Sequence, residues 1–133
     1  MRTWLAALLL LTAGCSTTPE VACPAIGTRV GIGLTVPQPA GITRATLEAC
    51  WGDQCVTRPA DLRPDDATGG LQGFADVPGL QAEPIRVTVR FDDGKPHTTV
   101  VTPAFSEPGG PACGQAGPQA QLVAGADREV RPR

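Results

Sequence analysis

The sequence predicts an all-β fold, an antiparallel β-sandwich of six to seven short strands. Apolar residues alternate with polar residues or glycine along several short segments, which is the period-two pattern of half-buried strands. No window of a dozen residues carries a helical stripe of apolar side chains without an interrupting glycine or proline, and the chain holds 16 glycines and 14 prolines. Its 133 residues, of which 41% are hydrophobic, suffice for one domain with a core.

The clearest strands are three segments in which every second residue is apolar. They cover residues 30–36, 45–51 and 85–91. The first of them ends at Pro37, which has no backbone N–H to donate to a neighbouring strand. In the third, Arg86 and Arg90 occupy intervening positions, so we expect one buried face and one solvated face.

Turn residues predict two further hairpins in the second half of the chain. Asp93-Gly94 is typical of a tight hairpin turn, and it leads into a strand over residues 97–102. A terminal hairpin is expected to join residues 119–124 to residues 129–131. Short strands with links rich in glycine and proline are typical of a sandwich.

The N-terminal stretch begins with one basic residue, Arg2, and continues with an apolar run over residues 5–11. That run is too short to cross a bilayer of about 30 Å as a permanent helix, but it fits a cleaved signal helix. The following Thr12-Ala13-Gly14-Cys15 resembles the lipobox of bacterial lipoproteins, although Thr12 stands where leucine is commonest. The resemblance implies cleavage before Cys15 and attachment of a diacylglyceryl group to its thiol, with palmitate as a typical acyl chain.

This resemblance divides the chain into three parts. They are a signal peptide over residues 1–14, a short tether from lipidated Cys15 over residues 15–24, and the sandwich over residues 25–133. It implies a protein anchored to the cell membrane on its extracytoplasmic face, or facing the periplasm in a bacterium with an outer membrane. An ordinary secretory peptide with a chance cysteine and an uncleaved anchor are the alternatives.

The cysteine count agrees with the lipobox. The chain has five cysteines, and an odd number in an exported protein needs an explanation. If Cys15 is acylated, four remain, and an even set suits two disulfides in an oxidising compartment. The four are Cys23, Cys50, Cys55 and Cys113.

Cys50 and Cys55 lie at the ends of the stretch "CWGDQC". Gly52-Asp53 fits a two-residue type II′ hairpin loop, which places the two cysteines opposite each other at a non-hydrogen-bonded pair. We therefore expect a Cys50–Cys55 disulfide on the outer side of the sheet, with Trp51 toward the core. Cys23 with Cys113 would then close a loop of about 90 residues. The other two pairings of the four cysteines stay open in principle.

Two weaker resemblances concern the folded part. The stretch "GFADVPGLQAEPIRVTV", residues 73–89, resembles the strand–"PGL"–strand passage of transthyretin-like and immunoglobulin-like repeats. The chain after Cys15 also resembles small lipoproteins of actinobacteria, with a matching bias toward arginine, alanine, glycine and proline. These resemblances imply membrane anchoring and a β-sandwich, and no particular activity.

The residues suggest no enzyme and no cofactor. After the signal peptide the chain contains only two serines, Ser16 and Ser106, that could act as a catalytic nucleophile. His97, the single histidine, is expected to be exposed beside a turn. A redox role for Cys50 and Cys55 lacks the C-x-x-C spacing at a helix N-terminus.

The acidic residues do not form a recognisable metal site either. They cluster in "DLRPDDATGG" and at Asp92-Asp93, without the spaced D-x-D-x-D-G pattern of calcium loops. We therefore expect no metal, with a calcium-binding loop as the alternative.

The sequence thus predicts a surface-anchored lipoprotein with a binding or structural sandwich. Its expected partners are the membrane, through the lipid, and an envelope protein or cell-wall ligand. A formal net charge of −2 argues against nucleic acid. An envelope thiol–disulfide protein using Cys50 and Cys55, or an enzyme with an unrecognised site, is the alternative.

Overall fold

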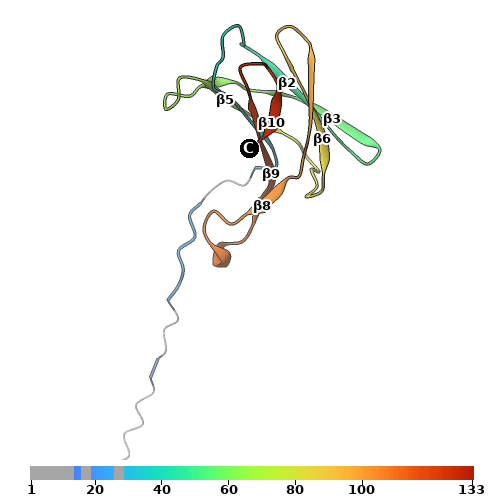
Figure 1. Ribbon diagram of the computed structural model, residues 1–133. Helices are drawn as coiled ribbons and strands as arrows, with labels where there is room; N and C mark the ends of the chain where they lie inside the picture. The colour runs from blue at the N-terminus through green and yellow to red at the C-terminus, as the bar shows by residue number, and fades with distance from the viewer. Residues whose placement is uncertain (1–13, 16–18, 26–28) are drawn as a thin grey trace, which may run out of the picture.

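The computed structural model describes residues 14–15, 19–25 and 29–133 (Figure 1). The predicted signal peptide, residues 1–14, lies almost entirely outside the described residues, so its helix is not tested. Within them the chain forms two β-sheets packed against each other, with the C-terminus beside the first sheet (Figure 1). No helix among these residues has the length and apolar character needed to cross a bilayer.

Sheet A has six strands in the order β10-β9-β1-β5-β4, with β8 also paired to β9. In chain order they are β1 (Gly31–Val36), β4 (Arg63–Pro64), β5 (Leu71–Asp76), β8 (Ala104–Ser106), β9 (Ala116–Ala124) and β10 (Val130–Pro132). Two of its five pairings, β1 with β5 and β1 with β9, join strands that are distant in the sequence.

Sheet B has four strands in the order β3-β2-β6-β7. They are β2 (Ala45–Trp51), β3 (Gln54–Ala60), β6 (Ile85–Phe91) and β7 (Pro96–Val101). The sheet consists of two hairpins, β2–β3 and β6–β7, that lie side by side through β2 and β6. All of its pairings are antiparallel.

The predicted all-β architecture with two sheets is confirmed, as are the strands over residues 45–51 and 85–91 and the terminal hairpin. Two details of the prediction are wrong. The described residues contain ten strand segments rather than six or seven, because β4 and β8 are very short and β5 lacks a clear period-two pattern. The sandwich is also not purely antiparallel, since β1 runs parallel to β9. No hairpin links these two strands, so no local turn dictates their relative direction.

The core lies between the sheets and is apolar throughout. Sheet A contributes Ile32, Leu34 and Leu122, and sheet B contributes Leu47, Val87 and Val89, among other buried side chains. In β2 and β6 buried and exposed residues alternate along almost the whole strand, as the sequence predicts. No polar or charged residue in the described part of the chain is classed as buried.

Candidate functional site

Cys15, the predicted lipidation site, is exposed and is the free cysteine of the described residues. The described residues between it and the sandwich, 19–25, form no regular secondary structure and are exposed. Figure 1 shows this segment leaving the molecule at the end where β8 lies. An accessible thiol in an extended segment is compatible with modification by an enzyme, and the modification itself stays a prediction.

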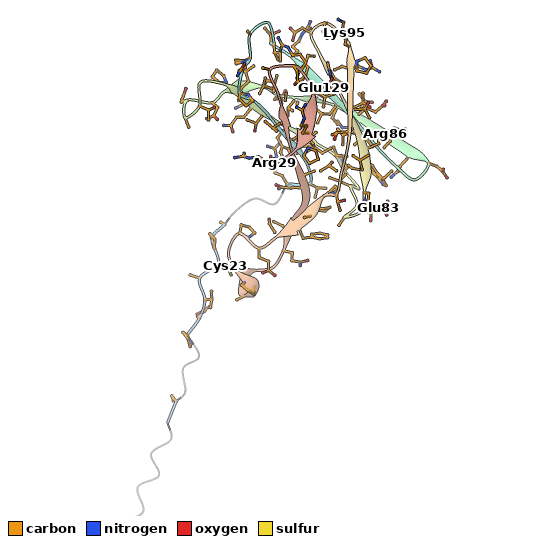
Figure 2. The ribbon with its side chains drawn as sticks, viewed as in Figure 1. Cys23, Arg29, Glu83, Arg86, Lys95 and Glu129 are labelled. Atoms are coloured by element: carbon orange, nitrogen blue, oxygen red, sulfur yellow. A yellow bond between two sulfur atoms is a disulfide. The ribbon has the colours of Figure 1, made fainter. Side chains whose placement is uncertain are left out.

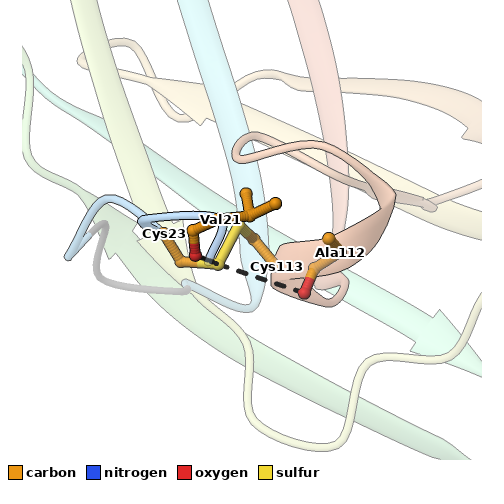
Figure 3. Close-up of a disulfide and its surroundings, with 4 residues drawn as sticks. All are labelled: Val21, Cys23, Ala112 and Cys113. Carbon is orange, nitrogen blue, oxygen red and sulfur yellow. Dashed lines mark hydrogen bonds between the residues drawn. A yellow bond between two sulfur atoms is a disulfide. The ribbon is translucent and has the colours of Figure 1, made fainter. Parts of the chain in front are cut away.

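Cys23 and Cys113 form the long-range disulfide that the sequence predicts, with Cα atoms 5.4 Å apart (Figure 3). Cys113 ends the 3₁₀ turn η1 (Pro111–Cys113), whose flanking Gly110 and Gly114 both have positive φ angles. The Cys23 sulfur lies 4.0 Å from the Ala112 carbonyl oxygen, but a disulfide sulfur has no hydrogen to donate, so this contact is packing only. The bridge ties the end of the tether to the segment between β8 and β9.

Cys50 and Cys55 form the second predicted disulfide, which joins directly opposed residues of β2 and β3. Their Cα atoms are 4.1 Å apart, close to the about 4.5 Å of a non-hydrogen-bonded pair. Gly52 has a φ of 55° and Asp53 has no positive φ, as a type II′ turn requires. Trp51 is buried, as predicted.

Glu48 lies beside this hairpin bridge, on the same outer face of sheet B. Its carboxylate and the two sulfurs lie within 4.8 Å of one another. Both sulfurs are bonded to each other, so neither is the thiolate that a metal ion binds. In its disulfide form the cluster is not a metal site.

The remaining residues that the sequence singled out do not come together as a catalytic site. Ser16 lies outside the described residues, and Ser106 is exposed on β8. Asp65 accepts hydrogen bonds from the Ala67 N–H at 3.1 Å and the Thr68 hydroxyl at 2.8 Å, so its carboxylate is used by its own loop. Asp93 likewise accepts the Lys95 N–H at 3.0 Å.

Asp92 fastens the loop that precedes β2. It accepts the backbone N–H groups of Thr43 and Arg44, at 2.9 Å each, and the Thr43 hydroxyl. The hydrogen bonds from Thr43, then that from Arg44, hold the pKa of Asp92 well below its usual range. This acid is structural.

His97 is not exposed, contrary to the prediction. It pairs with Val89 in β7, so its ring points toward the core side of the sheet, and its side chain is only 12% exposed. The ring centroid lies 5.8 Å from that of Phe91, and Nδ1 lies 3.6 Å from a carboxylate oxygen of Glu129 in the link before β10. This ring therefore fills the space between the two sheets at their edge.

Sequence reasoning missed a groove on the outer face of sheet A. In β1 the residues facing the core are apolar, whereas Gly31 and Gly33 face outward and leave no side chain there. Gly33 lies opposite Phe74 of β5 on one side and Gln121 of β9 on the other. Because β1 adds no side chain of its own, the Phe74 ring reaches over Gly31 and the Gln121 side chain over Gly33, and an open groove lies at Gly33 between these neighbours.

The groove has a volume of about 430 Å³ and a largely polar lining. Besides Gly33 and Gly73 it is lined by Arg29, Asp61, Arg63, Gln72, Phe74 and Gln121. Within the described part of the chain, the side chains of Asp61, Arg63, Gln72 and Gln121 have no hydrogen-bond partner. The groove therefore presents donors and acceptors that are available to a ligand.

Arg29 at one end of the groove is held in place. Its guanidinium makes hydrogen bonds of 3.0–3.3 Å with both carboxylate oxygens of Asp76, and its central carbon lies 4.0 Å from the centre of the Phe74 ring. Figure 2 shows Arg29 and Arg86 on opposite sides of the sandwich. The groove therefore opens away from sheet B.

Two further hollows continue the groove. One of about 540 Å³ shares Asp61 and Arg63 with it and extends past Arg44 toward β2 and β3. Another of about 400 Å³ shares Gln72 with it and extends to Thr68 and Arg133. Together they make an extended, open surface rather than a closed cavity.

The alternation of glycine with apolar residues in "VGIGLTV" could have indicated this surface, because glycine in a strand lets groups from neighbouring strands approach its backbone closely. The partners across the strands could not have been found from the sequence, since β5 and β9 are distant from β1. No protein-family model matches the chain, and neither a curated protein nor a solved structure gives a significant match.

Proposed function

We propose that the protein is a lipid-anchored binding protein of the bacterial cell envelope, with the groove on sheet A as its binding surface. The observation that carries the proposal is the groove of unpartnered polar side chains. The lipobox-like Thr12-Ala13-Gly14-Cys15 supports the anchor, and the cysteine that it leaves at position 15 is exposed. The passage over residues 73–89, which runs from β5 through Pro78-Gly79 into β6, supports a sandwich of the immunoglobulin-like or transthyretin-like type.

The tether keeps the sandwich close to the membrane in this proposal. Seven residues separate Cys15 from Cys23, and an extended segment of that length spans at most about 25 Å. Because Cys23 is bonded to Cys113, the tether is attached to the sandwich at that point. Two or three acyl chains at Cys15 would give stable attachment, since one chain alone binds a bilayer only marginally.

The envelope thiol–disulfide alternative has less support. Cys50 and Cys55 join two strands of a tight hairpin, and they are not placed at a helix N-terminus that would stabilise a thiolate.

The anchor is tested by expressing the full chain with Cys15→Ser in a bacterium. We expect the parent chain to be cut before Cys15 and to carry acyl groups in mass spectra of the intact protein. The variant should stay unprocessed or be released without lipid. Ser16→Ala is a matched control that changes the neighbouring residue and should leave the modification intact. An unmodified N-terminus at any other residue of the parent chain would contradict the proposed anchor.

A further inference from the structure

We infer that the groove on sheet A binds a neutral, hydroxyl-rich polymer, that is, a glycan chain. This inference rests on the proposed function, because it assigns the ligand class of the proposed binding surface. It is carried by the groove's lining, its charge balance and its place on the sheet.

The lining suits hydroxyl groups. The side-chain amides of Gln72 and Gln121 each offer two donors and an acceptor, Arg63 offers donors only, and Asp61 offers acceptors only. A hydroxyl group both donates and accepts, and neighbouring hydroxyls on a sugar ring match planar amide, guanidinium and carboxylate groups. These side chains lack partners within the described residues, so a ligand need not break existing hydrogen bonds to reach them.

The charges in the groove nearly cancel, which favours a neutral ligand over an anionic polymer. Arg29 is already paired with Asp76, and the free guanidinium of Arg63 shares the lining with the carboxylate of Asp61. A phosphate-rich or uronate-rich chain would meet the Asp61 carboxylate as well as the arginine. The formal net charge of −2 adds repulsion at longer range.

The position of the groove disfavours a peptide bound as an added strand. The groove lies over β9, β1 and β5, and β1 is hydrogen-bonded to both neighbours along its length. Strand addition needs a free sheet edge with unpaired backbone groups. Any ligand over the centre of this sheet must therefore be recognised by side chains, as a glycan is.

The openness of the groove favours a chain over a small molecule or a lipid. Small ligands are usually enclosed in mostly apolar cavities. Here the Gln121 side chain lies over Gly33 at the floor, the lining is mostly polar, and neighbouring hollows continue the groove on both sides through Gln72 and through Asp61 and Arg63. Arg29, held by Asp76 and Phe74, gives one end of the groove a rigid wall.

The test uses the full chain, purified in detergent and titrated with defined probes by calorimetry. The neutral probes are linear tetrasaccharides: chitotetraose, cellotetraose and maltotetraose. The comparison probes are tetragalacturonate, which is anionic, and a neutral tetrapeptide. We expect at least one neutral tetrasaccharide to bind and neither comparison probe to do so.

Variants locate the binding. Arg63→Ala and Gln121→Ala should each weaken binding of the neutral tetrasaccharide about tenfold, the loss expected for one hydrogen bond involving a charged or well-placed group. Gly33→Val should abolish binding by filling the floor of the groove. Arg86→Ala is the matched control, because it removes an exposed arginine from the outer face of sheet B and should change nothing.

The outcomes separate the inference from the proposed function. Binding of tetragalacturonate or of the peptide that is lost in Gly33→Val would overturn the inference of a neutral glycan and support the groove as a binding surface. Glycan binding that Gly33→Val and Arg63→Ala leave unchanged would overturn the assignment to this groove. Absence of binding by every probe would overturn the glycan inference, whereas the anchor is decided separately by the Cys15→Ser experiment.

Discussion

The two sheets of this molecule are assembled in different ways. Sheet B consists of two hairpins with short turns, and its strands alternate regularly between buried and exposed residues. Sheet A brings together strands from both ends of the chain, and β1 lies between β5 and β9. The disulfides follow the same division, since Cys50–Cys55 lies within one hairpin of sheet B and Cys23–Cys113 spans 90 residues to the segment before β9. Local turns specify both hairpins of sheet B, which then meet through one long-range pairing of β2 with β6, whereas β1 in sheet A has a long-range partner on both sides.

The outer faces differ as well. On sheet B, Thr88 and Thr98 form a hydrogen bond of 3.0 Å across β6 and β7, and a hollow of about 390 Å³ is lined by Cys50, Arg86 and Val100 among others. On sheet A, β1 adds no outward side chain at Gly33, and the groove there continues into two neighbouring hollows. The more extended hollow surface is therefore that of sheet A.

The largest difference between the sheets should appear in the free energy of unfolding when each disulfide is removed in turn. Loop-closure entropy predicts how much each disulfide stabilises the fold. The double variant Cys23→Ala/Cys113→Ala should lower the free energy of unfolding by about 4–5 kcal/mol, and the double variant Cys50→Ala/Cys55→Ala should lower it by about 2 kcal/mol. The first loss is a large share of a typical total of about 5–15 kcal/mol. Urea unfolding of the two double variants beside the parent protein measures both.

Peptide mapping without reducing agent must first confirm the pairing in the protein used. A Cys50–Cys113 linkage, or a larger loss from the hairpin pair, would reverse the comparison and point to a special role for "CWGDQC".

Alanine at the two outward glycines of β1 should give unequal effects. At Gly31 a new Cβ would overlap the Ala75 carbonyl oxygen, which is backbone and cannot move aside without disturbing the β1–β5 pairing. We expect Gly31→Ala to cost about 1–3 kcal/mol of the free energy of unfolding. At Gly33 the Cβ would meet the end of the Gln121 side chain, which can swing away, so Gly33→Ala should change stability by about 0.5 kcal/mol or less.

Denaturant unfolding of both variants gives this difference directly. Equal losses at Gly31 and Gly33 would mean that β1 is free to shift and that sheet A is less tightly specified than its pairing indicates.

Lowering the pH should change stability least, and this change comes from Asp92, which holds the loop before β2 in sheet B. The pKa of Asp92 is lowered in the folded protein, so its ionised form contributes stability above about pH 4, and this contribution is lost as the pH falls below that value. Asp92→Asn should therefore lower the melting temperature slightly at pH 7, and the difference from the parent should shrink toward about pH 2. The effect is small because solvent screens an exposed carboxylate.

Melting curves at several pH values measure this difference, with Asp93→Asn as the neighbouring control. A difference that stays constant from neutral to acid pH would show that the Asp92 charge does not fasten the loop before β2.

Much of the fold was predictable where the information is local. The period-two pattern located β2 and β6, and the residues Gly52-Asp53 placed Cys50 opposite Cys55. The parallel pairing of β1 with β9 was not predictable, because no turn connects these strands. The prediction for His97 was wrong because the neighbouring Pro96 and turn suggest exposure, whereas the register of β6 and β7 sets His97 opposite buried Val89.

The candidate site was hidden for a related reason. Arg63, Gln72 and Gln121 are ordinary surface residues in the sequence, and they share a groove only because β4, β5, β1 and β9 are neighbours in one sheet. In the sequence the glycines of β1 fit an ordinary strand pattern. Their outward position indicates a groove only when β5 and β9 are known to flank β1.

The place of β1 in the sheet also determines when, during synthesis, it can pair with both of its neighbouring strands. Sheet B is complete once Val101 has been made, but β1 gains its second neighbour only when β9, which ends at Ala124, has followed. Until then one edge of the first strand is unpaired, and an unpaired strand edge invites association with another chain. The part of the protein that is made first is therefore among the last to be protected, and a chain cut short before β9 would retain sheet B while leaving β1 open to aggregation.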